Sequence, residues 1–347
     1  MIRPSLLFCF LLGGSLLANS QSTEWKPAGD HIKTPWTDSV KPANVLPDYP
    51  RPQLVRSGNW TNLNGLWQYA ILPKFSGDAI PTSFQGQILV PFAVESSLSG
   101  IEKTVGKDSI LWYSRNINTP GLAKNKSTLL HFGAVDWLCD VYVNGTKVGT
   151  HQGGYDPFSF DITAALKKGN TQQLAVRVWD PSDDGPQPRG KQVRRPNSIW
   201  YTPVTGIWQT VWMESVPTTY IASTKQVPDV DKKALHISVN AENLMPGDAV
   251  RVTAWDGTNK VAEQVLTGTN ETDLQIANPK LWSTENPFLY DLKVYIERKG
   301  KPVDAISSYF AMRKISLAPD KQGVQRMMLN DKFLFQYGPL DQGWWPD

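Results

Sequence analysis

The chain has 347 residues, which is enough for two or three domains. Hydrophobic residues make up 40% of it, charged residues 19%, and the formal net charge is +3. This balance excludes a wholly disordered chain, a collagen or coiled-coil repeat and a polytopic membrane protein, and the dispersed basic residues form no stripe for nucleic acid.

The first twenty residues have the pattern of a secretory signal peptide. The apolar run Leu6–Leu17 is too short to span a bilayer, and Ala18 and Ser20 fit the small-residue cleavage pattern. We therefore expect cleavage before Gln21 and a secreted or periplasmic protein that does not stay in the membrane; an uncleaved anchor is the alternative. Cys139 is the one cysteine left in the mature chain, so no internal disulfide is expected.

Residues 21–58 contain six prolines and no periodicity, which predicts an extended arm lying on a folded domain. Residues 59–217 are predicted to form a first β domain, because short runs rich in Val, Ile, Trp and Tyr alternate with turn residues. The pair Asn144-Gly145 predicts a type I′ hairpin, and Ile162–Leu166 is predicted to form one helical turn. The predicted strands are Leu66–Leu72, Ile88–Val90, Leu111–Ile117, Thr128–Phe132, Leu138–Val143, Gln173–Trp179 and Ile207–Met213.

Residues 218–317 are predicted to form a second β domain. Leu235, Ile237 and Val239 alternate with polar residues, and Met245–Asp248 has the composition of a turn. Short strands and turns at such intervals suggest an immunoglobulin-like sandwich, although the paired cysteines of antibody domains are absent. A last apolar run, Val324–Tyr337, predicts one more strand before the final residues.

Eight segments, in this order, resemble glycoside hydrolase family 2, the family of β-galactosidases, β-glucuronidases and β-mannosidases. The resemblance extends from about Trp60 to the last residue. The segments are Trp60–Tyr69, Ile88–Ile101, Leu111–Arg115, Val141–Thr163 (which includes V-Y-V-N-G-T-K-V-G-T-H-Q-G-G-Y-D-P-F), Arg189–Gln192 (R-G-K-Q), Ile199–Glu214 (I-W-Y-T-P-V-T-G-I-W-Q-T-V-W-M-E), Leu281–Tyr290 and Tyr309–Ile315.

The resemblance implies an all-β chain: a jelly-roll sugar-binding domain, an immunoglobulin-like domain, and then the beginning of a catalytic (β/α)₈ barrel. Met328–Gly338 resembles the lead-in and first strand of that barrel. Residues 318–347 are far fewer than the roughly 200 residues that a barrel needs. In the family both catalytic carboxylates are glutamates late in the barrel, so no catalytic residue is expected here and the 347-residue chain alone is predicted to be inactive.

Three residues are predicted to contact sugar in the intact enzyme. The family's first domain reaches the active site with an acidic residue after a strand, and Asp180 is the nearest match; a residue that only opens the turn before Pro181 is the alternative. In the loop after the predicted barrel strand, Asp341 could accept hydrogen bonds from sugar hydroxyls and Trp344 could stack on a sugar ring. The family's galactosidases place Arg and His within this loop instead.

Other features carry weaker predictions. The four histidines are far apart without metal-ligand spacing, so neither a metal site nor another cofactor is expected. Arg189, Lys191, Arg194 and Arg195 form a basic run, for which a solvated loop and a contact to an acidic sugar are the two interpretations.

The resemblance therefore predicts the N-terminal portion of an exported, β-galactosidase-like glycoside hydrolase with a retaining two-glutamate mechanism and a β-linked carbohydrate as its partner. The alternative is a non-catalytic carbohydrate-binding or scaffold protein made of two sandwiches. In the fragment, the sandwich faces that would pack on the barrel are exposed to solvent. Large exposed apolar patches favour association, so a homo-oligomer or self-association of the fragment is expected.

Overall fold

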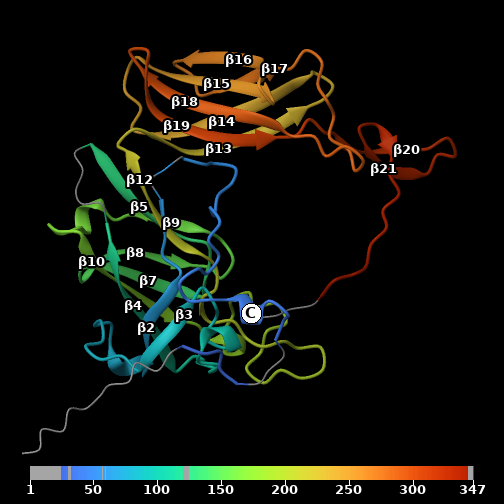
Figure 1. Cartoon of the computed structure of the whole chain (residues 1–347). Coiled ribbons are helices and arrows are strands. Elements are labelled where there is room, and N and C mark those ends of the chain that lie inside the picture. The colour runs from blue at the N-terminus through green and yellow to red at the C-terminus, as the bar shows by residue number, and fades with distance from the viewer. Residues whose placement is uncertain (1–24, 30–32, 57, 59, 120–124, 343–346) are drawn as a thin grey trace, which may run out of the picture.

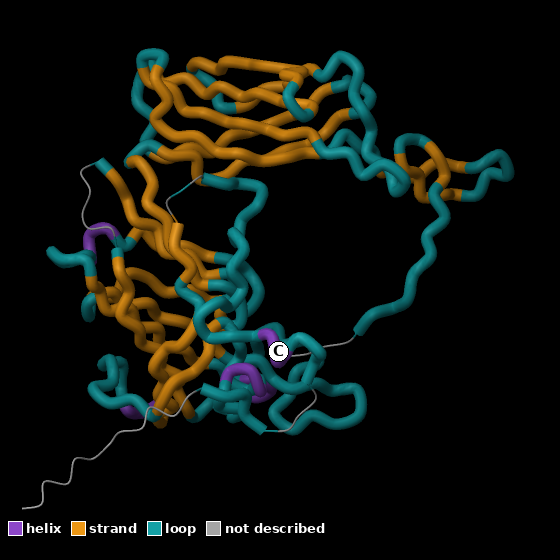
Figure 2. Tube along the Cα trace, viewed as in Figure 1, coloured by secondary structure: helices purple, strands orange, loops and turns teal. Residues whose placement is uncertain are grey.

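The structure, a computed structural model, describes residues 25–29, 33–56, 58, 60–119, 125–342 and 347. Two β-sandwiches stand one above the other, and a small three-stranded sheet lies beside the second (Figure 1). The helices in the described residues are single 3-10 turns of three residues (Figure 2). The predicted all-β class is confirmed for this part of the chain, which forms no (β/α)₈ barrel. The predicted signal peptide lies outside the described residues.

The first sandwich is built from two main antiparallel sheets. The larger sheet has the order β3 (Gly86–Val90), β2 (Gly65–Pro73), β4 (Ser109–Asn118), β10 (Thr171–Trp179), β7 (Leu138–Val143) and β8 (Thr146–Gln152). The smaller sheet has the order β1 (Trp60–Asn62), β12 (Val211–Pro217), β5 (Lys126–Phe132) and β9 (Phe158–Asp161).

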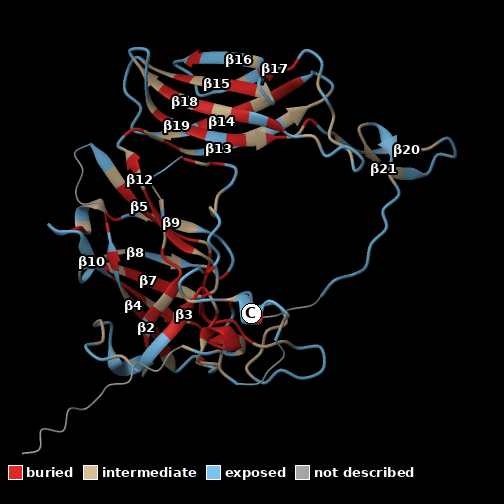
Figure 3. Ribbon diagram, in the orientation of Figure 1, coloured by how far each residue is buried: buried red, intermediate tan, exposed pale blue. Residues whose placement is uncertain are grey.

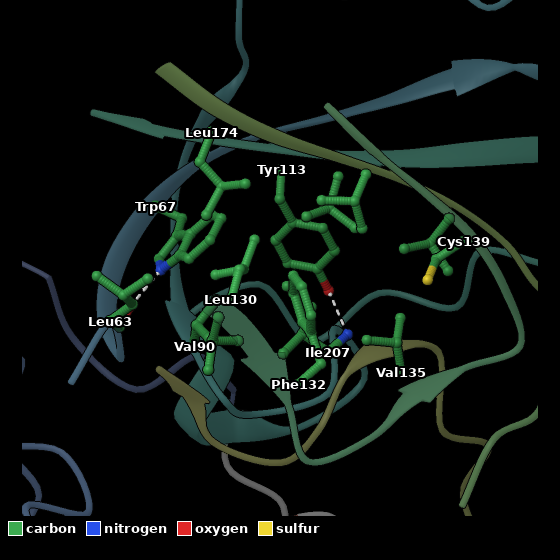
Figure 4. Close-up of a cluster of buried hydrophobic side chains, with 14 of the residues drawn as sticks. Leu63, Trp67, Val90, Tyr113, Leu130, Phe132, Val135, Cys139, Leu174 and Ile207 are labelled. Atoms are coloured by element: carbon green, nitrogen blue, oxygen red, sulfur yellow. Dashed lines mark hydrogen bonds between the residues drawn. The ribbon is translucent and has the colours of Figure 1, made fainter. Parts of the chain in front are cut away.

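The core of this sandwich fills the space between the sheets (Figure 4). Trp67 and Tyr113 from the larger sheet are at most 1% exposed and belong to one cluster with Leu130 and Phe132 from β5. The Tyr113 hydroxyl accepts a hydrogen bond from Ile207 N at 3.2 Å, so its polar atom is satisfied inside the core. Each such apolar side chain contributes about 1.5–3 kcal/mol on burial, which makes this cluster the main support of the domain.

Six of the seven strands predicted in the first domain are present, but the prediction of one strand over Ile207–Met213 is wrong. The segment is divided into β11 (Gly206–Ile207), which pairs with β6 (Val135–Asp136), and β12. Between them the Trp208 indole donates to the carbonyl oxygen of Gly154 at 2.7 Å. This bond fixes Trp208 to a different loop, so the chain leaves one ladder before it enters the next.

The predicted hairpin and helical turn are confirmed. Asn144 and Gly145 have φ angles of 52° and 83° and join β7 to β8, as a type I′ turn requires. The Asn144 amide donates to the carbonyl oxygen of Ala165, the last residue of the 3-10 turn Thr163–Ala165, at 2.9 Å. The hairpin is therefore held against the neighbouring turn.

The second sandwich has the immunoglobulin-like character that the alternation predicts. Leu235, Ile237 and Val239 are fully buried, and Asp248 N donates to Met245 O at 3.0 Å in the predicted turn. One sheet has the order β13 (Tyr220–Asp229), β14 (Ala234–Glu242) and β17 (Glu271–Gln275), and the other β16 (Asn259–Thr267), β15 (Asp248–Asp256), β18 (Tyr290–Arg298) and β19 (Lys301–Phe310).

The arm before the first sandwich contacts both sandwiches. Leu54 belongs to the second core, and Val55 exchanges backbone hydrogen bonds with Ser307 of β19 at 2.8 and 2.9 Å. The Arg56 guanidinium lies 3.2 Å from Glu214 of β12 and 3.1 Å from Asp304 of β19. The arm therefore joins the two domains through one buried cation.

The carboxylate of Glu214 is held in its ionised form. Burial alone would raise its pKa, but contact with His131 and the positive charges of Arg56 and Arg51 overcome that effect and lower the pKa to about 2. His131 Nε2 lies 3.2 Å from Glu214 Oε1.

The predicted strand over Val324–Tyr337 is also wrong in its extent. The chain instead forms an antiparallel sheet of β20 (Ile315–Pro319), β21 (Gln325–Leu329) and β22 (Lys332–Phe333), and no strand follows in residues 334–342. Asn330 and Asp331, with φ angles of 52° and 61°, turn the chain back at the point where Met328–Gly338 was expected to continue as a barrel strand. Figure 3 shows that β20 and β21 contain no buried residue, in contrast to the central strands of the two sandwiches.

Candidate functional site

The candidate site lies at the end of the first sandwich, where β6, β10 and β11 finish. The β6–β11 ladder places Asp136 opposite Gly206, and Asp180 follows the last residue of β10. These loops enclose a cavity of about 20 Å³, which has room for one water molecule. Its lining is Asp136, Tyr155, Asp180, Ser182, Gln187, Arg189, Gln192, Pro203, Val204 and Trp208.

Asp180 is 2% exposed and organises the loops around the cavity. Its carboxylate accepts hydrogen bonds from Ser182 N at 2.8 Å, Thr205 Oγ1 at 2.7 Å and Gln187 Nε2 at 3.3 Å. These bonds tie the turn after β10 to the segment before β11. Contact of Asp180 with a sugar stays a prediction; what the geometry adds is that this side chain holds its neighbours in place.

Two further carboxyl groups lie close to Asp180. Burial, together with the charge of Asp180, raises the pKa of Asp136 to about 8. Burial also raises the pKa of Glu95 well above its usual value, against the effect of hydrogen bonds from Thr205, and raises that of Asp180 against the effect of its own hydrogen bonds. At neutral pH this cluster therefore carries less negative charge than three ordinary acids would.

Several polar atoms at the cavity have no hydrogen-bond partner within the described ranges. They are Gln187 Oε1, Arg189 Nε and Gln192 Oε1. Gln187 is fixed in orientation, because its Nε2 donates to Ser182 O at 2.6 Å as well as to Asp180. Buried polar groups of proteins are normally paired, so this end of the sandwich has unused capacity to bind a polar ligand.

A larger open groove continues from this cavity. It has a volume of about 1040 Å³, runs between the arm, the smaller sheet and β13, and shares Tyr155 and Trp208 with the cavity. The two rings meet edge to face with centroids 6.1 Å apart, and Tyr155 is 48% exposed. Further along, Trp212 stacks on His131 at 3.9 Å. Aromatic faces beside amide and guanidinium groups can hold a sugar ring through its apolar face and its hydroxyls.

The C-terminal segment approaches the same end of the first sandwich. Gln342 Oε1 accepts a hydrogen bond from Lys191 Nζ at 2.7 Å, and the carboxylate of Asp347 accepts from Leu98 N at 3.0 Å. Asp341 is exposed, next to Gln342, so two of the predicted sugar residues, Asp180 and Asp341, belong to neighbouring regions. Trp344 lies outside the described residues.

The sequence interpretation missed Asp136, Tyr155 and Trp208. Asp136 was concealed because it stands within an apolar run that reads as the start of a strand, and its neighbour in space, Gly206, is far away in the chain. The signal that could have found it is an acidic residue in an otherwise apolar stretch.

Other kinds of chemistry find less support. Cys139 is buried in the first core, and burial raises its pKa to about 12, so its thiol is not a nucleophile at neutral pH. The described ranges hold no group of three or more His, Cys, Asp or Glu side chains that could bind a metal ion. Across the same ranges we find no helix with the length and apolar character that crossing a bilayer requires.

Comparison with protein families gives two matches. Residues 58–217 match the family "Glycosyl hydrolases family 2, sugar binding domain", and residues 219–313 match "Glycosyl hydrolases family 2". The two matches are consecutive and together cover both sandwiches.

Known proteins give a consistent result. A β-galactosidase from Thermoanaerobacter pseudethanolicus is 26% identical over 274 residues, which are 75% of this chain and 36% of the relative. A β-glucuronidase from Streptococcus agalactiae is 23% identical over 286 residues, 77% of this chain and 45% of the relative. The solved β-glucuronidase from Ruminococcus gnavus in complex with D-glucuronic acid has a TM-score of 0.67 at 20% identity, over 82% of this chain and 50% of that one. The chain thus spans half or less of the length of these relatives.

Proposed function

The chain belongs to glycosyl hydrolase family 2, and we propose that it is the N-terminal portion of an exported enzyme that hydrolyses O-glycosidic bonds of β-linked sugars. The consecutive match of the sugar-binding and immunoglobulin-like domains carries this proposal. A retaining glycosidase needs two carboxyl groups about 5–5.5 Å apart, one as acid and one as nucleophile. We place both as glutamates outside these 347 residues, so the chain alone does not cleave glycosides.

The described residues contribute to sugar binding rather than to bond cleavage. In the proposed enzyme Asp341 accepts hydrogen bonds from sugar hydroxyls and Trp344 stacks on a ring. Asp180 keeps the cavity loops in place for the sugar. The hydrogen bond between Lys191 and Gln342 supports this arrangement, since it joins the Asp341 segment to the loop next to the cavity.

Turnover assays test the proposal directly. The 347-residue protein, with its mass verified, is incubated with aryl β-galactoside, β-glucuronide and β-mannoside, beside the longest in-frame product of the same coding region. We expect no turnover by the 347-residue protein and turnover of at least one substrate by the longer product. Cleavage by the shorter protein would refute the division of roles.

A non-catalytic carbohydrate-binding protein is the second candidate, and the open groove of about 1040 Å³ within the described chain favours it. It predicts a coding region that stops at Asp347 and a stable protein that binds saccharides without cleaving them. Sugar binding together with an in-frame catalytic domain would leave only the first candidate.

Export and association follow from the same proposal. A secreted or periplasmic protein should begin at Gln21 after processing, which N-terminal sequencing of the exported protein measures. Ile315, Leu317 and Phe335 are each more than 70% exposed, so we expect the 347-residue protein to self-associate. A monomer in light scattering across a concentration series would contradict this expectation.

A further inference from the structure

Two basic side chains at the edge of the cavity have no acidic partner. Arg189 lines the cavity and its Nε is buried without a hydrogen bond, while Lys191 donates to the neutral amide of Gln342. Among the ion pairs of the described residues, none involves Arg189 or Lys191, whereas Arg194 of the same loop forms two. Both positive charges are therefore available to a ligand.

The next basic residue of the same loop behaves differently. Arg194 pairs with Asp183 at 2.8 Å and with Asp184 at 2.7 Å. The acidic residues of this loop are thus used by Arg194, and the excess positive charge remains at Arg189 and Lys191.

The backbone that carries these two residues is held on both sides. Gln192 N donates to Arg189 O at 3.3 Å, and Tyr201 N donates to Lys191 O at 3.0 Å. These two hydrogen bonds hold the backbone around Arg189 and Lys191 in one conformation. Less conformational entropy is therefore lost when the two side chains bind a ligand.

The acids behind Arg189 do not cancel its charge at neutral pH. Asp136 has a pKa raised to about 8 by burial and by the charge of Asp180, and the pKa of Asp180 is itself raised by burial. Asp136 is therefore largely protonated at neutral pH, so the acids behind Arg189 carry less negative charge than two ordinary carboxylates would.

We propose that Arg189 and Lys191 bind the anionic group of an acidic sugar and so determine the specificity of the site for acidic β-glycosides. The anion is a carboxylate or a sulfate ester, for which the planar guanidinium of Arg189 is suited. The sugar ring then lies over Tyr155 and Trp208, at the entrance of the larger groove. This inference rests on the proposed function and names its substrate class.

The test measures binding of methyl β-D-glucuronide, methyl β-D-glucoside 6-sulfate and methyl β-D-glucoside to the 347-residue protein by saturation-transfer NMR titration. We expect at least one acidic sugar to bind about tenfold more tightly than the neutral one, as a charge-assisted contact allows. Arg189→Gln and Lys191→Gln should each weaken binding of the acidic sugar more than binding of the neutral sugar, and so remove that preference. Arg195→Gln, which removes one exposed charge from the same loop, should keep it.

The outcomes separate the two proposals. Equal binding of neutral and acidic sugars, or loss of the preference in Arg195→Gln, would overturn the inference and leave the proposed function standing. No binding of any sugar would overturn the inference together with the sugar-binding role of this chain. Of the two acidic ligands, the one that Arg189→Gln weakens identifies the anion. The preference should also decline as pH rises through about 8, where Asp136 ionises.

Discussion

The two sandwiches follow the same alternation of apolar and polar residues, but they bury different polar groups. The first buries three acids, Glu95, Asp136 and Asp180, at one end, and two of them line the cavity. In the described part of the second, the buried carboxylates of Asp304 and Asp248 are each neutralised by an arginine, Arg56 and Arg298. Alternating strands therefore determine the scaffold of both domains, whereas the loops of the first domain alone carry uncompensated polar groups that can bind a ligand.

The largest expected difference between the domains is in their response to pH. Asp136 has a pKa of about 8 in the folded chain, because of burial and the charge of Asp180, against a usual value of 3.8. Between these values the unfolded chain has released its proton and the folded chain still holds it. The free energy of unfolding should thus fall as pH rises from about 4 to 8, by roughly 5 kcal/mol at most.

Asp136→Asn, which cannot ionise, should reduce this pH dependence. Urea unfolding at pH 5 and pH 8 measures it. Asp291→Asn, on the exposed side of β18 in the second sandwich, is the matched control and should leave the pH dependence unchanged. If the free energy of unfolding of Asp136→Asn changed with pH as much as that of the unmodified protein, Asp136 would not be the group that keeps its proton in the folded state.

Loss of the cation between the domains should have the next largest effect. Arg56→Met leaves Glu214 and Asp304 buried without their shared partner, and breaking a buried pair in this way costs about 3–5 kcal/mol. Arg251→Met, which removes a surface cation from Glu297 and Glu263 in the second sandwich, should hardly move the denaturation midpoint. Similar shifts for the two variants would contradict the role of Arg56 as a buried link.

A buried hydroxyl in each core allows a third comparison. The Tyr113 hydroxyl accepts from Ile207 N, which is fully buried, whereas that of Tyr290 accepts from Lys280 N on an exposed residue. Tyr113→Phe leaves a buried donor unpaired and should cost about 1–3 kcal/mol. Tyr290→Phe should cost less, because water can reach the freed amide; chemical denaturation of the two variants decides which is larger.

Local patterns predicted much of this fold. The burial of Leu235, Ile237 and Val239 follows from period-two alternation, and Asn144-Gly145 specifies its turn through two positive φ angles. The break after Ile207 could not be predicted, because it depends on a hydrogen bond from Trp208 to Gly154, a distant residue in the chain. Asn330-Asp331 is a pair of turn-forming residues and could have indicated the turn, but it lies within an apolar run that was interpreted as one strand.

The site was less predictable than the fold for a physical reason. Asp180 stands out in the sequence because it follows a strand and precedes a proline. Whether it faces a ligand or holds a loop depends on Thr205 and Gln187, which the chain brings to it only after folding. The same holds for the basic loop, where only the folded chain shows that Asp183 and Asp184 pair with Arg194.

The smallest expected effect concerns one histidine in each domain. His236 of the second sandwich pairs with Asp273 at 2.7 Å, and both side chains are over 40% exposed. His236→Ala should therefore lower the free energy of unfolding by only about 0.5 kcal/mol, because exposed pairs contribute little. His131→Ala removes a ring stacked on Trp212 beside buried Glu214, so it should cost several times more. If the two variants lost the same free energy of unfolding, the first domain would gain no stability from burying its polar groups. The two sandwiches would then differ in where their polar groups lie but not in what these groups contribute.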